Sequence, residues 1–202
     1  MRNPIDHLTH GLPRQWRIVI DWVVTILGAV AIVLAIKAYV VNPYRIPSSS
    51  MEPTLHCAKP GQGCLARYSD RVLANRFIYH FRDPHRGEIV VFHTPVRAQI
   101  ECDQGNGGGG TFVKRLIAIP GDRWREDNGY VYVNGKKLNE PYVKMRDHMT
   151  IPEQVVPKDG YIMLGDNRAS SCDSRRWGPV PRKDLVGPVV AVWWPPKRIG
   201  FR

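Results

Sequence analysis

The chain has 202 residues, enough for one or two domains, and 43% of them are hydrophobic, which excludes a wholly disordered protein. Its formal net charge of +11 suits an anionic partner, either a nucleic acid or a membrane surface. The basic residues are scattered, and no helix-turn-helix, zinc-finger or aromatic RNA-binding signature accompanies them. We therefore expect a basic surface that faces a membrane, and no nucleic-acid partner.

The N-terminal part of the chain predicts a membrane anchor. Residues 1–17 are polar, whereas residues 18–41 are almost wholly apolar and long enough to cross a hydrocarbon layer of ~30 Å as a helix. Trp22 and Tyr39 stand near the two ends, where aromatic belts form. A cleaved secretory signal begins in the same way, but this run is longer than the apolar region of such signals, and its one Ala-x-Ala sequence lies in mid-run. We therefore expect an uncleaved transmembrane helix after a short tail.

The cysteines bear on the compartment. The four are Cys57, Cys64, Cys102 and Cys172. None forms a CxxC pair, so the spacing of a zinc site is absent and no metal is expected. If the domain is exported, disulfides are expected; Cys57 and Cys64 would close a short loop, but four cysteines allow three connectivities and the sequence does not choose among them. The charges that flank the span give little orientation bias. The cysteines favour a single-pass protein of the cell membrane, with residues 1–17 in the cytoplasm and the C-terminal domain outside.

Short strand-like runs separated by turns fill the rest of the chain. These runs are 70–75, 77–81, 88–92, 112–119, 130–133, 161–164 and 189–194. Two Asn-Gly pairs, at residues 128–129 and 134–135, are strong hairpin signals, so residues 123–159 are expected to form a small β insert. The insert would separate two parts of one core, residues 42–122 and 160–202. The predicted fold class is mainly β: a single N-terminal transmembrane helix followed by an antiparallel β-sheet domain with a small β insert.

A polar, glycine-rich loop is expected over residues 97–111. Gly105, Gly107 and Gly110 match the GxGxxG spacing of dinucleotide-binding loops. That motif needs a preceding strand and a following helix, and the residues that follow here are strand-like. We therefore expect no cofactor.

The segment from Pro47 to Leu55 holds three successive serines between prolines. Because proline fixes φ and cannot donate a backbone hydrogen bond, this segment is expected to be a turn or an edge. Taken alone, it also suits a polar linker that leaves a membrane. A serine hydroxyl needs a neighbouring base to act as a nucleophile. Of the seven histidines, two lie before the apolar run and the other five stand singly in turn or strand contexts.

Lys114 is a candidate for that base. Alternate residues of a strand share a face, which puts Lys114 in line with Phe112, Leu116 and Ala118. Burial among apolar side chains lowers the pKa of a lysine, and the neutral amine can then accept the proton of a serine hydroxyl. A half-exposed lysine that reaches the solvent is the alternative.

Four blocks of the sequence resemble, in order, the motifs of bacterial type I signal peptidases. They are residues 44–55 (Tyr-Arg-Ile-Pro-Ser-Ser-Ser-Met-Glu-Pro-Thr-Leu), 86–92, 113–122 and 165–178. The single span before the first block also fits that family. The resemblance implies a membrane-bound serine endopeptidase that removes signal peptides from exported preproteins through an acyl-enzyme and cuts after a small-x-small sequence.

The resemblance also implies roles within a Ser/Lys dyad. Ser50 would be the nucleophile and Lys114 the general base. Ser48 would join the backbone N–H of Ser50 in stabilising the oxyanion, and Ser171 would hydrogen-bond the lysine amine and orient it. Ser49 would only space the other two serines.

Further support for the site is implied around Ser171. Asp173 and Arg175 would form an ion pair behind it, a surface pair being the alternative. Because Cys172 adjoins Ser171 and Cys102 precedes the lysine strand, a Cys102–Cys172 bridge near the site is one arrangement, and free buried thiols are the other.

An enzyme that reads small-x-small needs shallow apolar pockets and an exposed strand to pair with an extended peptide. The candidate pocket residues flank the serine and the lysine in the sequence, although each of them also suits a core. They are Tyr44, Ile46, Pro47, Met51, Leu55, Phe112 and Val113. Trp193 and Trp194 would either enter the bilayer surface or end a buried strand.

Two other functions fit parts of the sequence. A self-cleaving repressor of the Ser/Lys type would suit the basic charge, but it needs a DNA-binding domain where this chain has its apolar run. A catalytically silent, membrane-anchored β domain that binds peptides or envelope polymers would lack Ser50 or Lys114, and both are present. The expected partners are therefore preproteins with signal peptides and the lipid bilayer, with no nucleic acid and no metal.

Overall fold

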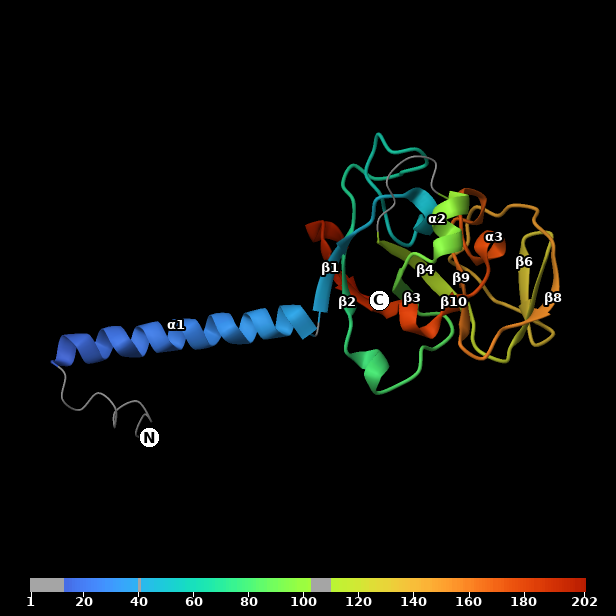
Figure 1. Cartoon of the computed structure of the whole chain (residues 1–202). Helices are drawn as coiled ribbons and strands as arrows, with labels where there is room; N and C mark the ends of the chain where they lie inside the picture. Colours follow the sequence, from blue (N-terminus) through green and yellow to red (C-terminus); the bar gives the residue numbers. More distant parts are fainter. Residues whose placement is uncertain (1–12, 40, 103–109) are drawn as a thin grey trace. The chain divides into compact units, whose positions relative to one another are not determined.

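The computed structural model of the chain describes residues 13–39, 41–102 and 110–202 (Figure 1). The chain divides into two compact units, Met1–Val40 and Val41–Arg202. All strands of the described residues belong to the second unit. A mainly β domain that follows one N-terminal helix is the fold class that the sequence predicts.

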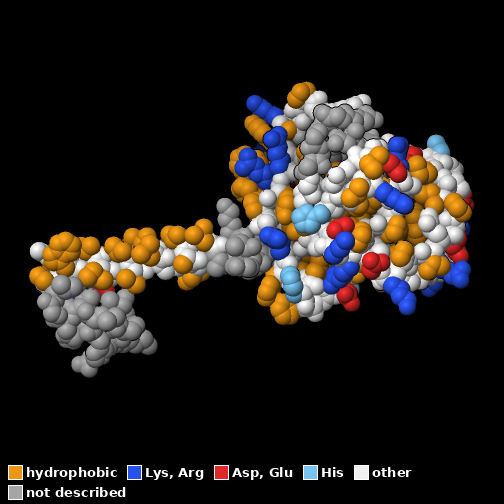
Figure 2. Space-filling model, viewed as in Figure 1, with side chains coloured by type: hydrophobic (Ala, Val, Ile, Leu, Met, Phe, Trp, Pro, Cys, Tyr) orange, Lys and Arg blue, Asp and Glu red, His pale blue; other side chains and the backbone are white. Residues whose placement is uncertain are grey.

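Helix α1, Arg14–Tyr39, forms the described part of the first unit. Its segment Arg14–Leu34 has a mean hydropathy of 2.2. Figure 2 shows hydrophobic side chains along this helix, most of them exposed. By length and composition it is the one helix among the described residues that can cross a membrane. The helix begins at Arg14 rather than at residue 18, because a helix can extend past its apolar run when its first turn is polar and solvated. The side chain of Tyr39, expected in an aromatic belt, lies outside the described part.

The second unit is built on an eight-stranded sheet in the order β1-β2-β11-β3-β4-β9-β10, with β12 paired to β11. Each pairing is antiparallel. The strands are β1 Val41–Arg45, β2 Arg71–Asn75, β3 Ile89–His93, β4 Thr111–Ala118, β9 Gly160–Leu164, β10 Val180–Pro181, β11 Leu185–Trp194 and β12 Gly200–Phe201. Strand β11 lies between β2 and β3, so the end of the chain joins the two earlier pairs of strands into one sheet.

A second, four-stranded sheet has the order β7-β6-β5-β8 and lies within residues 123–159. Its strands are β5 Arg123–Asp127, β6 Tyr130–Val133, β7 Lys136–Lys137 and β8 Ile151–Val155. Both predicted Asn-Gly turns are present: Asn128 and Asn134 have φ of 47° and 49°, and Gly129 and Gly135 each have φ of 76°. Two successive residues with positive φ are what a type I′ hairpin turn requires.

Two segments differ from the sequence prediction. Residues 77–81, expected to be a strand, contain the 3-10 helix η3, Ile78–His80; the Asn75 side chain accepts the backbone N–H groups that open this turn and so ends β2. The expected loop 97–111 begins instead with helix α2, Val96–Cys102. The other helices are η2 Ser49–Met51, η4 Arg168–Ser170, α3 Ser174–Trp177, η5 Arg182–Asp184 and η6 Pro196–Arg198.

Two disulfides settle the connectivity that the sequence left open. Cys57 bonds Cys64, which closes a short loop directly after the serine segment. Cys102 bonds Cys172, which ties α2 to the residue next to Ser171. Both bonds therefore hold segments that flank residues implied in catalysis.

Candidate active site

The serine segment folds as a short turn held by its own apolar side chains. Ser48 is extended, with φ −125° and ψ 159°, and η2 follows at Ser49–Met51. Met51 and Leu55 are 1% and 0% exposed and belong to the core cluster around β1, β2 and β11. Their burial anchors the C-terminal side of the turn in the core, so the serines directly before Met51 have little freedom to move.

The turn brings Ser50 against Lys114 of β4. The lysine Nζ donates a hydrogen bond of 2.6 Å to the Ser50 Oγ. Ser50 and Lys114 are 6% and 4% exposed. The Ser48 Oγ lies 3.2 Å from the Ser50 Oγ. A buried serine hydroxyl and a buried amine therefore meet, with the hydroxyl of the exposed Ser48 beside them, which is the geometry of a nucleophile with its base.

The pKa of Lys114 is lowered from 10.5 to about 8 by burial. Asp173 raises the lysine pKa, Arg175 lowers it further, and Asp166 raises it. An amine with a pKa of about 8 is neutral in an appreciable fraction of molecules under mildly alkaline conditions. It can therefore accept the proton of the Ser50 hydroxyl.

The side chains of β4 alternate between the two faces of the sheet as predicted from Phe112 to Leu116, and Lys114 lies on the expected face. Beyond Leu116 the alternation ends. Lys114 lies 5.6 Å from the centroid of the Phe112 ring, so the two side chains share a face. The pairing of β4 with β9 then shifts register between Leu116 and Ala118. As a result Ile117 and Ala118 both join the core cluster that faces the second sheet, and the expected alternation ends there.

The block after β9 holds the serine turn by its backbone. The side-chain amide of Asn167 donates to the Ser49 carbonyl at 3.1 Å, and the Asn167 backbone N–H donates to the Ser50 carbonyl at 3.0 Å. A Cβ on Gly165 would lie 2.5 Å from that same Ser50 carbonyl oxygen and would also clash with the Ser171 hydroxyl. Gly165 is therefore glycine because the backbone passes between Ser50 and Ser171 with no room for a side chain.

Ser171 lies beside the site but does not make the bond that the resemblance implies. Its hydroxyl is buried and has no hydrogen-bond partner among the described residues. Asp173 and Arg175 do form an ion pair, with 2.8 Å between the Asp173 Oδ1 and the Arg175 Nε. The Asp173 Oδ2 also accepts the Gly165 backbone N–H at 3.1 Å. The pair is buried, with both side chains at most 1% exposed, so it is no surface pair.

The candidate pocket residues separate into two groups. Ile46, like Met51 and Leu55, is buried in the core, at 2% exposure, and these three offer no surface to a peptide. The other four retain exposed surface, Pro47 most of all and the rest in part. They are Tyr44, Pro47, Phe112 and Val113. Sequence position next to the serine does not distinguish a pocket from the core beneath it, because both are apolar.

The comparisons with known proteins show to which family the chain belongs. A family model described as signal peptidase, peptidase S26, matches residues 19–194. The chain belongs to this family. A probable signal peptidase I-2 of Synechocystis is 40% identical over 179 residues, which cover 88% of this chain and 74% of the relative. A signal peptidase IB of Staphylococcus aureus is 34% identical over 195 residues, which cover 88% and 90%. A crystal structure of a signal peptidase I from Enterococcus faecalis is 27% identical, with a TM-score of 0.43, over 54% of this chain and 97% of that one.

As a member of the signal peptidase family, the protein is a serine endopeptidase that removes signal peptides. Among the described residues, no group of three or more His, Cys, Asp and Glu side chains is placed to hold a metal ion.

Several residues that build this signal peptidase site escaped the sequence reasoning. The Glu52 carboxylate is fully buried and accepts the backbone N–H groups of Cys57 and Leu65 at 3.0 and 3.2 Å, which fastens the disulfide loop to the serine turn. Asp166 accepts two bonds from Arg115, at 2.8 and 2.6 Å, and one from Thr54. Glu52 and Asp166 both lie inside the blocks that resemble the family's motifs. The sequence reasoning did not infer that their carboxylates are buried.

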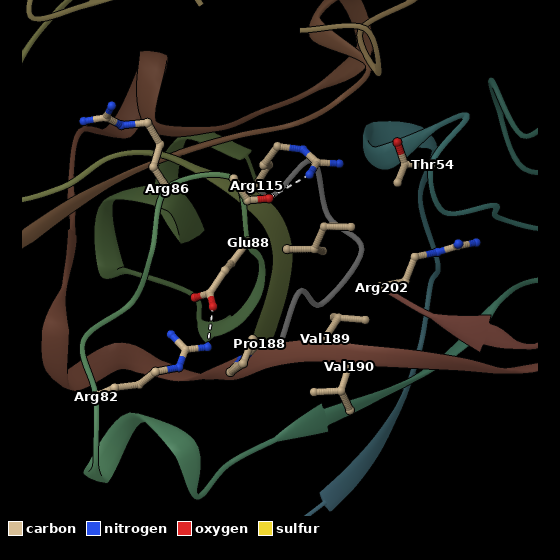
Figure 3. Close-up of a pocket in the computed structure, with 11 residues that line it drawn as sticks. Thr54, Arg82, Arg86, Glu88, Arg115, Pro188, Val189, Val190 and Arg202 are labelled. Atoms are coloured by element: carbon tan, nitrogen blue, oxygen red, sulfur yellow. Dashed lines mark hydrogen bonds and ion pairs between the residues drawn. The ribbon is translucent and has the colours of Figure 1, made fainter. Parts of the chain in front are cut away.

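A separate cavity of about 550 Å³ lies beside Thr54, near the C-terminal end of the serine segment (Figure 3). Thr54 and Arg115 line it together with Val189 of β11. Arg82 also lines the cavity and forms an ion pair with Glu88. Neither Ser50 nor Lys114 lines the cavity, so it is distinct from the candidate active site.

Proposed function

We propose that Ser50 and Lys114 are the catalytic dyad of this signal peptidase. The observation that carries the proposal is the 2.6 Å hydrogen bond between the Lys114 Nζ and the Ser50 Oγ at a site from which water is nearly excluded. In its neutral form the lysine takes the serine proton as the Oγ attacks the carbonyl carbon of the scissile peptide bond. The protonated amine then gives the proton to the leaving nitrogen, which releases the mature protein.

The tetrahedral intermediate carries an oxyanion that needs donors. The Ser50 backbone N–H and the Ser48 hydroxyl, which lies 3.2 Å from the Ser50 Oγ, supply them. The ester that remains on Ser50 is attacked by water, and Lys114 accepts the water proton. The signal peptide then leaves with its new carboxylate, and the serine regains its proton from the lysine.

The substrate lies extended across Tyr44, Pro47, Phe112 and Val113, the candidate pocket residues with exposed surface. Strand β1 is an edge strand of the described sheet, because it pairs with β2 alone. An edge strand offers backbone groups to an extended peptide, and the side chains beside it select small residues by their shape. This arrangement supports cleavage after a small-x-small sequence.

The N-terminal helix anchors the enzyme in a single span, with the tail in the cytoplasm and the catalytic domain outside. The two disulfides support this orientation, because such bonds persist in oxidising compartments. Trp193 and Trp194, each 37% exposed, stand at the end of β11 and contact the bilayer surface. Protease treatment of intact cells tests the orientation: digestion of the catalytic domain is expected, and its protection would reverse the topology.

Activity measurements test the dyad directly. The detergent-solubilised full chain and its Ser50→Ala, Lys114→Ala and Ser49→Ala variants are incubated with a preprotein. The first two are expected to lose activity by at least about 10³-fold, as when a member of a catalytic triad is removed. Ser49→Ala is the matched control and is expected to keep its rate, because the Ser49 hydroxyl makes no contact with the Lys114 amine. Full activity in either dyad variant would show that the catalytic groups lie elsewhere.

A further inference from the structure

Three carboxylates of the second sheet's segment and two arginines of the catalytic block form one buried cluster. Glu126 lies on β5, and Glu140 and Asp147 lie in the chain between β7 and β8. Their partners are Arg168 and Arg175, whose side chains are 0% and 1% exposed. The cluster joins segments that are far apart in the sequence; Arg175 lowers the pKa of Lys114, but the proposed hydrolytic steps give the three carboxylates no role.

Arg168 links the second sheet's segment to Gly165. Its Nη2 pairs with the Glu140 Oε1, and its Nη1 lies 3.4 Å from the other oxygen of that carboxylate. The same Nη1 lies 3.9 Å from the Glu126 Oε1. The remaining donor, Nε, bonds the Gly165 carbonyl at 3.0 Å. The Arg168 guanidinium therefore connects the Glu140 carboxylate to the backbone carbonyl of Gly165, which lies beside Ser50.

Arg175 makes a parallel link from the other side. Its Nη1 bonds the Asp147 Oδ2 at 2.7 Å and lies 3.4 Å from the Glu126 Oε1. Its Nε and Nη2 bond both oxygens of Asp173 at 2.8 and 3.0 Å. Asp173 in turn accepts the Gly165 backbone N–H at 3.1 Å. Arg168 thus bonds the carbonyl of Gly165 directly, and Arg175 is linked to the N–H of the same glycine through Asp173.

Charge balance shows why the second sheet's segment is needed. Within the catalytic block of the described structure, Asp173 is the one carboxylate that pairs with a buried guanidinium group, and it pairs with Arg175 but not with Arg168. Leaving a buried charge without a partner costs several kcal/mol, about 3–5 when one member of a buried pair is removed. Glu140 supplies negative charge to Arg168 and Asp147 supplies it to Arg175; Glu140 also pairs at 3.3 Å with Arg146, which is partly exposed. Glu126 is shared between them, and burial raises its pKa to about 7.

We propose that Glu140 and Asp147 are positioning residues for catalysis, which hold Arg168 and Arg175 so that Gly165 stays against the carbonyl of Ser50. The Gly165 backbone is packed directly against the site, because even a methyl group on its Cα would clash with the Ser50 carbonyl and the Ser171 hydroxyl. A shift of this backbone moves the nucleophile relative to its base. The proposal assigns a role to the second sheet's segment, and it rests on the proposed dyad.

Steady-state kinetics of the full chain test it with Glu140→Gln and Asp147→Asn. The control is Glu153→Gln, which removes a carboxylate from β8 of the same sheet, where the pair with Arg123 at 3.1 Å is exposed. Each variant is assayed well below its own melting temperature, so that all of it is folded. The kcat is expected to fall about 10- to 100-fold with KM nearly unchanged, because a misplacement of about 1 Å costs up to 10²-fold. Asp147→Glu, which restores the charge, is expected to recover most of the rate.

The outcomes separate this proposal from the dyad itself. A kcat within twofold of Glu153→Gln in both folded variants would overturn the positioning role and leave the dyad standing. Full activity of Ser50→Ala would instead overturn the dyad. Asp147 is 26% exposed, so its Asn variant is expected to fold. If that variant failed to fold while Glu153→Gln folded, the carboxylate would be a requirement of the fold rather than of the site, and the proposal would be wrong.

Discussion

Replacing Lys114 with methionine is expected to abolish activity and to stabilise the protein. The lysine pKa falls from 10.5 to about 8 on folding, and at about 1.4 kcal/mol for each unit of pKa this corresponds to a burial cost of roughly 3 kcal/mol. Methionine has a similar length and no charge to bury. It also loses the hydrogen bond to Ser50, worth about 1 kcal/mol. The expected net gain is about 2 kcal/mol, or several degrees in melting temperature for a domain of this size.

The pH dependence of the gain is the sharper test. Below pH 8 the amine is protonated in both the folded and the unfolded state, so the full burial cost is present. As the pH rises from about 8 toward 10.5, the folded wild type loses its proton first and the cost declines. Thermal unfolding of wild type and Lys114→Met, followed by circular dichroism, should therefore show a large difference at about pH 7 and a small one at about pH 10. A variant less stable than wild type near neutrality, or a difference independent of pH, would refute the reasoning.

Three further outcomes follow from the site. The kcat/KM of the wild type should rise with pH with a midpoint near the Lys114 pKa of about 8, and a profile that is flat between about pH 6 and 9 would exclude this lysine as the base. Gly165→Ala should remove nearly all activity, because its methyl group would lie 2.5 Å from the Ser50 carbonyl oxygen; an active variant would show that this approach is not needed. Replacing Cys102 and Cys172 together by serine should lower the free energy of unfolding by about 4 kcal/mol, as expected for a bond across 70 residues, and a denaturant titration that shows no change would contradict this.

The fold could be predicted where local chemistry decides it. The two Asn-Gly turns of the second sheet depend on residues that accept positive φ, so their positions were visible in the sequence. The 3-10 helix at Ile78–His80 was not, because it depends on the Asn75 side chain bonding the backbone that follows. Helix α2 was hidden for a similar reason: its stability rests on the fully buried Ala98 and on a disulfide to Cys172, which are tertiary contacts.

The same limit applies to the site. Ser50 and Lys114 could be singled out because each stands in a motif and the lysine has apolar neighbours on its face of the strand. The contacts that hold the site span long separations: Arg175 meets Asp147 across 28 residues and Glu126 across 49. A charged residue of a β segment looks solvent-exposed in a sequence, and its burial against a distant arginine has no local signal.

The position of β11 in the sheet implies an order in which a newly made chain can complete its proposed site. Ser50 follows β1 and Lys114 lies on β4, and in the described sheet the pairs β1-β2 and β3-β4 are joined through β11, Leu185–Trp194. This strand comes after all four of those strands in the sequence, so it is synthesised later than they are. A copy synthesised only as far as β4 therefore has its proposed nucleophile and base on two strand pairs that are not yet hydrogen-bonded through β11. The apolar helix at its own N-terminus, similar in composition to the segments that the family removes, is thus made before any catalytic power exists to cut it.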